Sequence, residues 1–306
     1  MAAQNPRVSV SQISTLHATF SDDLEAYAGA GLDGIGIWEL KLGDGPDDDA
    51  LAAFHASSLG AASAVPALPS ILPLPLLGGA DDPRERIDAI LGSLHRLAPF
   101  RPAGVVCLTG SGAGRDPDAA RELVADGLRE IGLEAESLGL TVALEAYQRD
   151  DSDRWSIVSS IPEALELIAD AGDGPALALQ FDVWHLWNSE TLFDDIEAHV
   201  DRFAGVHVCD RRVPTRGWAD RELPGCGGAD VPAVLAALAG AGWSGLYDIE
   251  VFSDDGTFGA SYDDSYWRLD PATFLARARS SFDEAWNDSL TPRPSRRGGP
   301  LTKEQR

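Results

Sequence analysis

Short apolar runs and amphipathic segments alternate along the chain. The runs are rich in β-branched residues, which is typical of buried strands, and the segments between them carry apolar residues at helical spacing. Eight such runs occupy residues 8–16, 34–40, 61–68, 104–110, 141–147, 177–185, 203–210 and 246–251. Because strand and helix alternate, the pattern predicts an α/β protein with a parallel sheet, and eight repeats favour a closed (β/α)8 barrel.

Helix boundaries support this order. Capping residues and first-turn prolines predict helix starts near residues 21–23, 81–83, 116–118, 161–163, 191, 230–232 and 270–271. Glycines near residues 29–31 and at Gly139 predict two helix ends. A Rossmann-like open sheet is the alternative, but no G-x-G-x-x-G motif follows the first run. We therefore expect one barrel domain over residues 1–288.

Three predicted connections, at residues 68–79, 211–229 and 251–270, are longer than a tight turn needs. The first is rich in proline and apolar residues and suits a pocket wall or a subunit contact. The other two contain Trp218, Phe252 and further aromatic residues, which could stack on a ring-bearing substrate, close as a lid or pack against the barrel rim. Residues 289–306 are polar and rich in proline, glycine and basic residues, which predicts a disordered tail.

Titratable residues interrupt the last four apolar runs of the chain. Glu145, Asp182, His185, His207 and Glu250 lie at or just before predicted strand ends. A buried carboxylate is costly unless it is paired, hydrogen-bonded or bound to a metal, and barrel strands end at one common mouth. Two glutamates, one aspartate and one histidine suit one divalent ion, Mn²⁺ first and Mg²⁺ or Co²⁺ next. The alternative is a set of strand-end residues satisfied by ion pairs or hydrogen bonds.

The composition excludes several classes of protein. The 306 residues include 24 Lys and Arg against 49 Asp and Glu, so the net charge is -25. This charge argues against nucleic-acid binding and against an anionic membrane surface, and it is typical of a very soluble or halophilic protein. No signal-peptide pattern and no run of eighteen apolar residues occur, so we expect a cytoplasmic protein. Three widely spaced cysteines indicate free thiols rather than a cysteine-rich zinc site.

Four strand motifs resemble one enzyme superfamily. ALEAY, QFDVWH, GVHVCDRR followed by PGCGGADV, and YDIEV resemble the sugar-phosphate isomerase/epimerase superfamily, the xylose isomerase-like TIM barrels. This superfamily includes ketose 3-epimerases, inosose dehydratases, hydroxypyruvate isomerases and the large subunits of C-glycoside deglycosidases. The resemblance covers about residues 8–286 and implies a single TIM barrel. Its motifs are specific for the superfamily but not for one reaction.

The resemblance implies a role for each residue of the predicted metal site. The metal ligands would be Glu145, Asp182, His207 and Glu250. In the epimerases of this superfamily two metal-bound glutamates exchange protons with the substrate on opposite faces of an enediolate, and Glu145 and Glu250 would do so here. His185 would be a third catalytic residue that polarises or orients a substrate oxygen. Packing between two tryptophans is the alternative role of His185.

Substrate binding is predicted for residues outside this set. By the resemblance Arg212 would bind substrate oxygens. Arg211 and Arg216 of the same connection compete for this role, because a loop sequence does not determine which guanidinium points inward. Glu39 and His17 follow the second and the first predicted strands, so they could reach the same mouth and bind substrate there.

The first functional hypothesis is a metal-dependent isomerase or epimerase of a sugar or keto-sugar that transfers a proton through an enediolate. The alternative is a lyase with the same chemistry, either C-deglycosylation of 3-oxo-C-glycosides with a small partner subunit or inosose-type dehydration. DNA repair of the endonuclease IV type is disfavoured by the acidic charge and the six histidines, whereas a non-catalytic sugar-binding barrel stays open. The expected partners are a small sugar or glycoside, and either further copies of the chain or a small second subunit.

Overall fold

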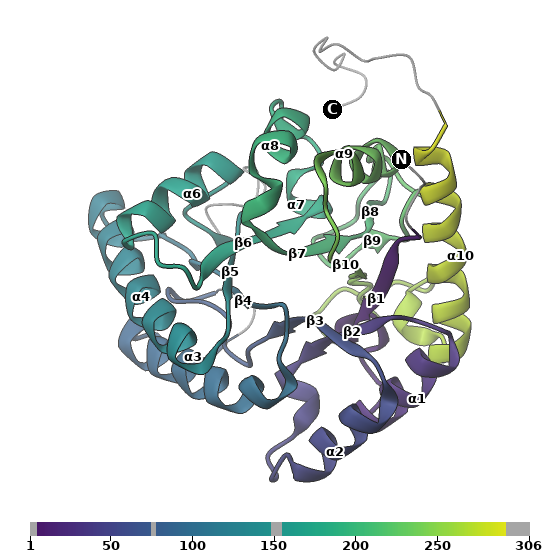
Figure 1. Cartoon of the computed structure of the whole chain (residues 1–306), viewed down its shortest axis with the longest axis horizontal. Coiled ribbons are helices and arrows are strands. Elements are labelled where there is room, and N and C mark those ends of the chain that lie inside the picture. The colour runs from purple at the N-terminus through teal and green to yellow at the C-terminus, as the bar shows by residue number, and fades with distance from the viewer. Residues whose placement is uncertain (1–4, 75–77, 148–154, 292–306) are drawn as a thin grey trace.

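The apolar runs form a closed barrel of parallel strands with helices on its outside (Figure 1). The computed structural model describes residues 5–74, 78–147 and 155–291. Around the barrel the strands follow the order β1-β10-β7-β6-β5-β4-β3-β2. Their bounds are β1 (Arg7–Ser11), β2 (Gly34–Trp38), β3 (Gly60–Val65), β4 (Gly104–Cys107), β5 (Val142–Glu145), β6 (Leu177–Asp182), β7 (Phe203–Val208) and β10 (Leu246–Ile249). The predicted single-domain (β/α)8 TIM barrel is confirmed.

The helices begin largely where capping residues predict them. They are α1 (Phe20–Gly29), α2 (Asp48–Ser57), α3 (Pro83–Leu97), α4 (Pro117–Leu138), α6 (Ile161–Asp170), α7 (Val183–Leu186), α8 (Leu192–His199), α9 (Val231–Ala241) and α10 (Pro271–Ser289), with short 3-10 helices η1 (Gln12–Thr15), η2 (Glu39–Leu42), η3 (Ala98–Phe100), η4 (Val200–Arg202) and η5 (Tyr266–Arg268). Asp82, Asp116, Asp230 and Asp270 each accept a hydrogen bond from a backbone N–H of the helix that follows, and each of these helices has proline in its first turn. Each such cap stabilises the fold by about 0.5–2 kcal/mol.

Side chains of the barrel strands alternate between the surrounding helices and the barrel interior. In β1, Val8 and Val10 belong to the main hydrophobic core, whereas the alternating Ser9 and Ser11 are buried on the other face. In β10, Asp248 is likewise a buried polar residue. Part of the barrel interior is therefore polar, and this part adjoins the strand ends where the titratable residues gather.

The structure differs from the predicted elements in several places. Residues 12–15 and 183–185, the ends of two predicted strands, belong to the helices η1 and α7. No helix start was predicted for α2, whose cap position makes no side-chain hydrogen bond. A small antiparallel hairpin of β8 (Asp210–Arg211) and β9 (Arg221–Glu222) forms within the predicted loop 211–229, because two-residue strands leave no periodic pattern to read. Helix α1 begins at Phe20, one residue earlier than predicted, because Thr19 and Asp22 form a capping box.

Parts of two predictions fall outside the described residues. Ser289 still belongs to α10, and residues 292–306 of the predicted tail are not described. Residues 75–77 of the predicted connection 68–79 are not described either. In the described part of the chain, no helix combines the length and the apolar character that crossing a membrane requires.

Candidate active site

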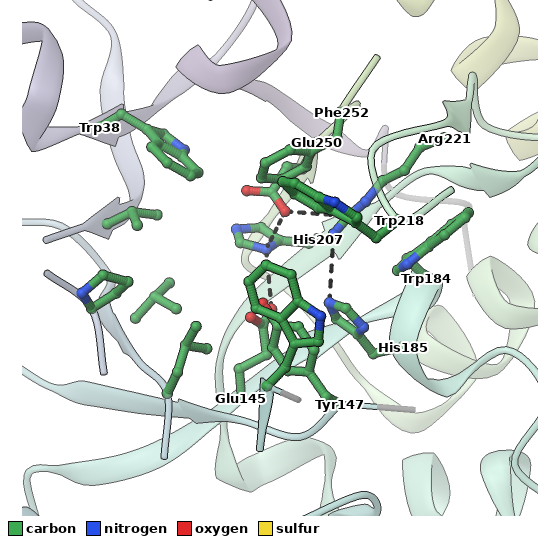
Figure 2. Close-up of a pocket in the computed structure, with 15 residues that line it drawn as sticks. Trp38, Glu145, Tyr147, Trp184, His185, His207, Trp218, Arg221, Glu250 and Phe252 are labelled. Carbon is green, nitrogen blue, oxygen red and sulfur yellow. Dashed lines mark hydrogen bonds and ion pairs between the residues drawn. The ribbon is translucent and has the colours of Figure 1, made fainter. Parts of the chain in front are cut away.

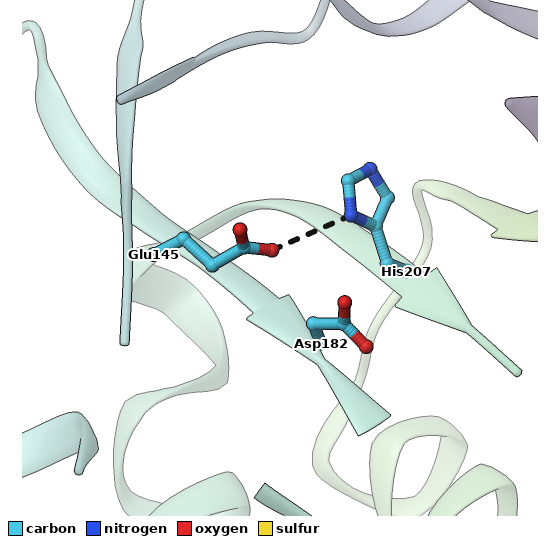
Figure 3. A group of neighbouring side chains, drawn as sticks. All are labelled: Glu145, Asp182 and His207. Carbon is cyan, nitrogen blue, oxygen red and sulfur yellow. Dashed lines mark ion pairs between the residues drawn. The ribbon is translucent and has the colours of Figure 1, made fainter. Parts of the chain in front are cut away.

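Three of the predicted metal ligands converge at the barrel mouth. Glu145 ends β5, Asp182 ends β6, and His207 lies near the end of β7 directly across from Asp182. One ligand-type atom from each residue lies within 4.8 Å of the others, and all three side chains are buried. Figure 3 shows the two carboxylates and the imidazole pointing toward one another. Strand order thus brings together residues that are far apart in the sequence.

Glu250, the fourth predicted ligand, borders the same centre from the other side. It directly follows β10, which pairs with β7. Its Oε2 lies 3.3 Å from His207 Nδ1 and 3.1 Å from Arg221 Nη1, while its Oε1 accepts a hydrogen bond from Ser11 Oγ at 3.2 Å. Glu250 is therefore near the predicted metal position, with one of its oxygens held by a guanidinium.

The polar atoms of this centre fit a divalent cation. Glu145 Oε1 and His207 Nδ1 are buried and make no hydrogen bond, although they lie 3.5 Å apart. Buried polar atoms without partners are costly and call for an explanation, for which an ion is one candidate. Carboxylate oxygens and one imidazole are ligands that Mn²⁺, Mg²⁺ and Co²⁺ accept.

Proton affinities in the centre are strongly shifted. Burial raises the pKa of Glu145 to about 7, and the neighbouring charges of Asp182 and Glu250 add to this rise. Burial opposes the charged form of His207, but the carboxylates of Glu250 and Glu145 outweigh it and raise the pKa of the imidazole to about 10. Burial likewise disfavours the charged form of Asp182, yet the cation of Arg221 lowers the pKa of this carboxyl.

Arg221 is a site residue that the sequence reasoning missed. Its side chain is buried, and Nη1 donates hydrogen bonds to Asp182 Oδ2 at 2.9 Å and to Glu250 Oε2 at 3.1 Å. The guanidinium also lies 4.7 Å from the ring centre of Phe252. Figure 2 shows it reaching the centre from the side of β9. Because β9 is two residues long and lies inside a long loop, no local sequence pattern indicates that the Arg221 side chain points into the site.

The prediction that Arg212 binds substrate oxygens is not supported by its position. Its guanidinium makes ion pairs of 3.0–3.1 Å with Asp220, Glu222 and Asp264, and it is not among the described residues that line the site cavity. Three carboxylates hold it outside the mouth.

The two competing arginines are engaged elsewhere as well. Arg216 pairs with Asp220 and Asp264, and the guanidinium of Arg211 lies over the ring of Trp187 at 4.9 Å. Among the four arginines of this segment, Arg221 is the one whose contacts are with the predicted metal ligands.

His185 lines the cavity as a packed, neutral imidazole. Its ring stacks on Tyr147 with the ring centres 3.6 Å apart, and burial lowers the pKa of His185 to about 3. Nε2 lies 3.5 Å from Arg221 Nη2 and 3.7 Å from Asp182 Oδ2. His185 is thus packed, as in the alternative, and it also lines the cavity, while its catalytic role stays a prediction.

Glu39 and His17, two predicted substrate-binding residues, lie away from the metal centre. Glu39 is buried, accepts a hydrogen bond from the N–H of Ala67 at 2.8 Å and lies 3.5 Å from Arg96. His17 is half exposed and pairs with Asp255 at 2.8 Å. Neither is among the described residues that line the site cavity, because both side chains turn toward partners outside the mouth.

The cavity has a polar side and an apolar side. The polar side chains come from β5, α7, β7, β9 and the end of β10, whereas β2, β3 and β4 contribute Trp38, Val65 and Val106 to the opposite wall (Figure 2). Trp218 and Phe252 of the two long connections also line it, with ring centres 5.6 Å apart. Further aromatic residues of these connections pack behind them, so packing at the barrel rim is one use of these loops.

Comparisons with known proteins agree with this architecture. The family described as xylose isomerase-like TIM barrel matches residues 24–276. A putative hydroxypyruvate isomerase of Streptomyces coelicolor (strain ATCC BAA-471 / A3(2) / M145) is 27% identical over 188 residues, which cover 58% of this chain; the match spans 64% of the length of that relative. Two solved structures have a TM-score of 0.74. The IolI protein with a zinc atom is 18% identical, and the match covers 94% of this chain and 100% of that chain. An L-ribulose 3-epimerase is 17% identical, and the match covers 93% of this chain and 96% of that chain.

The structural likenesses show the barrel fold, and the family match extends over most of the chain. The predicted superfamily is therefore confirmed. The chain belongs to the xylose isomerase-like TIM barrel family.

Proposed function

We propose that this protein is a divalent-metal-dependent isomerase or epimerase that transfers a proton between carbon atoms of a sugar or keto-sugar. The observation that carries the proposal is the buried cluster of Glu145, Asp182 and His207 at the barrel mouth, which includes ligand atoms without hydrogen-bond partners. Glu250 would complete the set. When bound, Mn²⁺, Mg²⁺ or Co²⁺ would stabilise the negative charge that develops on adjacent substrate oxygens as a C–H proton is removed.

Glu145 and Glu250 are the proposed proton-transfer residues. They approach His207 Nδ1 from two strands, β5 and β10, that lie on either side of β7 and β6 in the barrel. Two carboxylates on different sides of one substrate could remove a proton from one face and return it to the other.

Arg221 and His185 are the proposed substrate-orienting residues. Arg221 would supply the fixed positive charge that the resemblance assigned to Arg212, because its guanidinium is the one beside the ligands. The neutral His185 ring, held by Tyr147, would hydrogen-bond a substrate hydroxyl or carbonyl oxygen. The names of an isomerase and a 3-epimerase among the similar proteins support this class of reaction, and the zinc atom named with IolI supports a metal.

The test couples metal analysis to proton exchange. The protein, loaded in turn with Mn²⁺, Mg²⁺ and Co²⁺, is incubated in D2O with ketoses and inososes, and deuterium incorporation is followed by mass spectrometry. Glu145→Gln and Glu250→Gln should each lower the exchange rate by about 10²–10⁴-fold. The control is Asp195→Asn, which alters a buried carboxylate of α8 that bonds Thr191. Sugar binding without exchange, or exchange that survives both glutamine variants, would favour a non-catalytic sugar-binding barrel or a different reaction.

One observation favours the lyase alternative as a second candidate. The apolar wall with Trp38, Trp218 and Phe252 offers few hydrogen-bond partners to the hydroxyls of a free sugar, and it suits a ring-bearing aglycone. Elimination from a 3-oxo-C-glycoside releases the aglycone, whereas epimerisation keeps the substrate mass. Adding such glycosides to the same screen therefore separates the two reactions. A homo-oligomer or a small second subunit remains part of this proposal, and size-exclusion chromatography with light scattering tests it.

A further inference from the structure

A second buried carboxylate lies behind the predicted ligand His207. Asp248 is on β10, in register with His207 on β7, and is 1% exposed. Within the described part of the chain, Asp248 forms an ion pair with His207. Nε2 of His207 lies 3.8 Å from Asp248 Oδ2. Asp248 Oδ1 has no hydrogen-bond partner. Burying such a carboxylate is costly, so its position calls for a reason beyond packing.

Ser63 of β3 connects this carboxylate to the imidazole. Its hydroxyl donates to Asp248 Oδ2 at 2.8 Å, and its oxygen lies 3.1 Å from His207 Nε2. A hydroxyl has one proton, and this one is given to Asp248. Ser63 Oγ therefore accepts from His207, which requires a proton on Nε2. In the neutral imidazole the lone pair is then on Nδ1, the nitrogen that faces Glu145 and Glu250.

The neighbouring strand leaves room for this arrangement. A Cβ on Gly36 of β2 would lie 2.2 Å from Asp248 Oδ2, so a larger residue at position 36 would displace the carboxylate. Four strands thus contribute to the arrangement around His207 Nε2: β2 with Gly36, β3 with Ser63, β7 with His207 itself and β10 with Asp248.

We infer that Ser63 and Asp248 are positioning residues that hold His207 with its proton on Nε2 and its Nδ1 lone pair directed at the metal. The inference rests on the proposed function only in taking this centre to bind a divalent ion. Hydrogen-bonded carboxylates behind a ligand histidine fix its tautomer and ring orientation, and losing them costs about 10–100-fold in metal affinity.

Metal affinity provides the first test. Titration calorimetry with Mn²⁺ and with Co²⁺ on the full chain should give affinities about 10–100-fold weaker for Ser63→Ala and Asp248→Asn than for the unaltered protein. The Co²⁺ absorption spectrum should change in both variants, because the imidazole is no longer fixed. Ser281→Ala is the matched control: it removes a buried serine hydroxyl of α10 whose bond is to Ala278 of the same helix, and it should leave the affinity unchanged.

Histidine NMR provides a test that does not depend on the variants folding. Long-range ¹⁵N–¹H spectra of the zinc-loaded, unaltered protein should show His207 protonated on Nε2. Affinities within twofold of the unaltered protein in both variants would overturn the inference and leave the metal proposal standing. A proton on Nδ1 would overturn the inference and would also remove His207 from the proposed ligand set. An unaltered protein that binds no divalent ion would overturn the metal proposal and this inference together.

Discussion

Three carboxylates, from Glu145, Asp182 and Glu250, meet one guanidinium, from Arg221, at the barrel mouth. When His207 is neutral, as a metal ligand must be, two of these negative charges are not compensated by Arg221, and a divalent cation would balance them. Buried charges persist when they are paired and hydrogen-bonded.

Replacing Arg221 should therefore destabilise the metal-free protein. Arg221→Met leaves the buried Asp182 and Glu250 without their shared cation, and we expect the free energy of unfolding to fall by about 3–5 kcal/mol. Urea unfolding followed by tryptophan fluorescence measures this loss. Arg84→Met, which removes ion pairs from an arginine that is 47% exposed, should cost less than about 1 kcal/mol. Similar losses in the two variants would contradict the role given to Arg221.

Metal affinity should rise with pH. In the metal-free centre the raised pKa values, about 10 for His207 and about 7 for Glu145, mean that protons occupy groups that a metal must use. Metal binding then displaces these protons, so affinity falls as pH drops below 7 and increases toward pH 9. Calorimetry at pH 8 in buffers of different ionisation enthalpy should show net proton release. Binding that is independent of pH between 6 and 9 would argue against His207 as a ligand.

The β8–β9 hairpin carries Arg221 into the site, and Asp210 holds its base together. The Asp210 carboxylate accepts hydrogen bonds from the N–H groups of Arg211, Gly227 and Ala229 at 2.7–2.8 Å. The chain is so close here that a Cβ on Gly227 would lie 2.3 Å from the carbonyl oxygen of Arg211. The small β8–β9 hairpin, which lies outside the barrel sheet, thereby determines the position of the buried Arg221 guanidinium.

Gly227→Ala should loosen this hairpin. The added methyl group forces the backbone apart and weakens the Asp210 bonds, so we expect a loss of about 1–3 kcal/mol in stability and a lower kcat/KM as Arg221 shifts. Gly45→Ala is the control, because a Cβ there meets no atom within 4 Å. Chemical unfolding and steady-state kinetics provide the two measurements. A Gly227→Ala protein with unchanged stability and activity would show that the hairpin does not position Arg221.

Four neighbouring strands of the barrel meet at the candidate metal centre. Glu145, Asp182 and His207 come from the adjacent strands β5, β6 and β7, and Glu250 follows β10, the next strand in the barrel order. An ion bound to all four would link four neighbouring strands. Because it would bind the folded chain and not the unfolded chain, it should stabilise the molecule as a whole.

Metal removal should therefore lower the unfolding temperature of the entire domain. At a Mn²⁺ concentration 100 times its Kd, linkage predicts about 2.7 kcal/mol of added stability, which a chelator should reverse. Differential scanning calorimetry with Mn²⁺ and with EDTA measures the effect. Asp182→Asn should abolish the difference between the two conditions. An equal shift in that variant would mean that the stabilising ion binds elsewhere.

Much of the fold and of the candidate ligand set could be predicted because each rests on a local pattern. Apolar runs and capping aspartates such as Asp116 determine where strands and helices begin. Once the runs are recognised as barrel strands, Glu145, Asp182 and His207 must meet, because parallel strands end at one mouth.

Side chains in loops and in the barrel interior could not be assigned in this way. The choice of Arg221 over Arg212 depends on a hairpin whose register arises from contacts across the long connection 211–229. The Glu39 side chain does not line the site cavity because it accepts a hydrogen bond from the N–H of Ala67, and this contact could not be predicted from the sequence.

The amino-acid sequence by itself thus determined the barrel, its family and the residues available for a metal, because periodicity and strand ends are local properties. Only the tertiary structure decided which arginine enters the barrel mouth and which side chains contact Nε2 of His207. Arg221, Ser63 and Asp248 reach the site through contacts between segments distant in the chain, and no local pattern records such contacts.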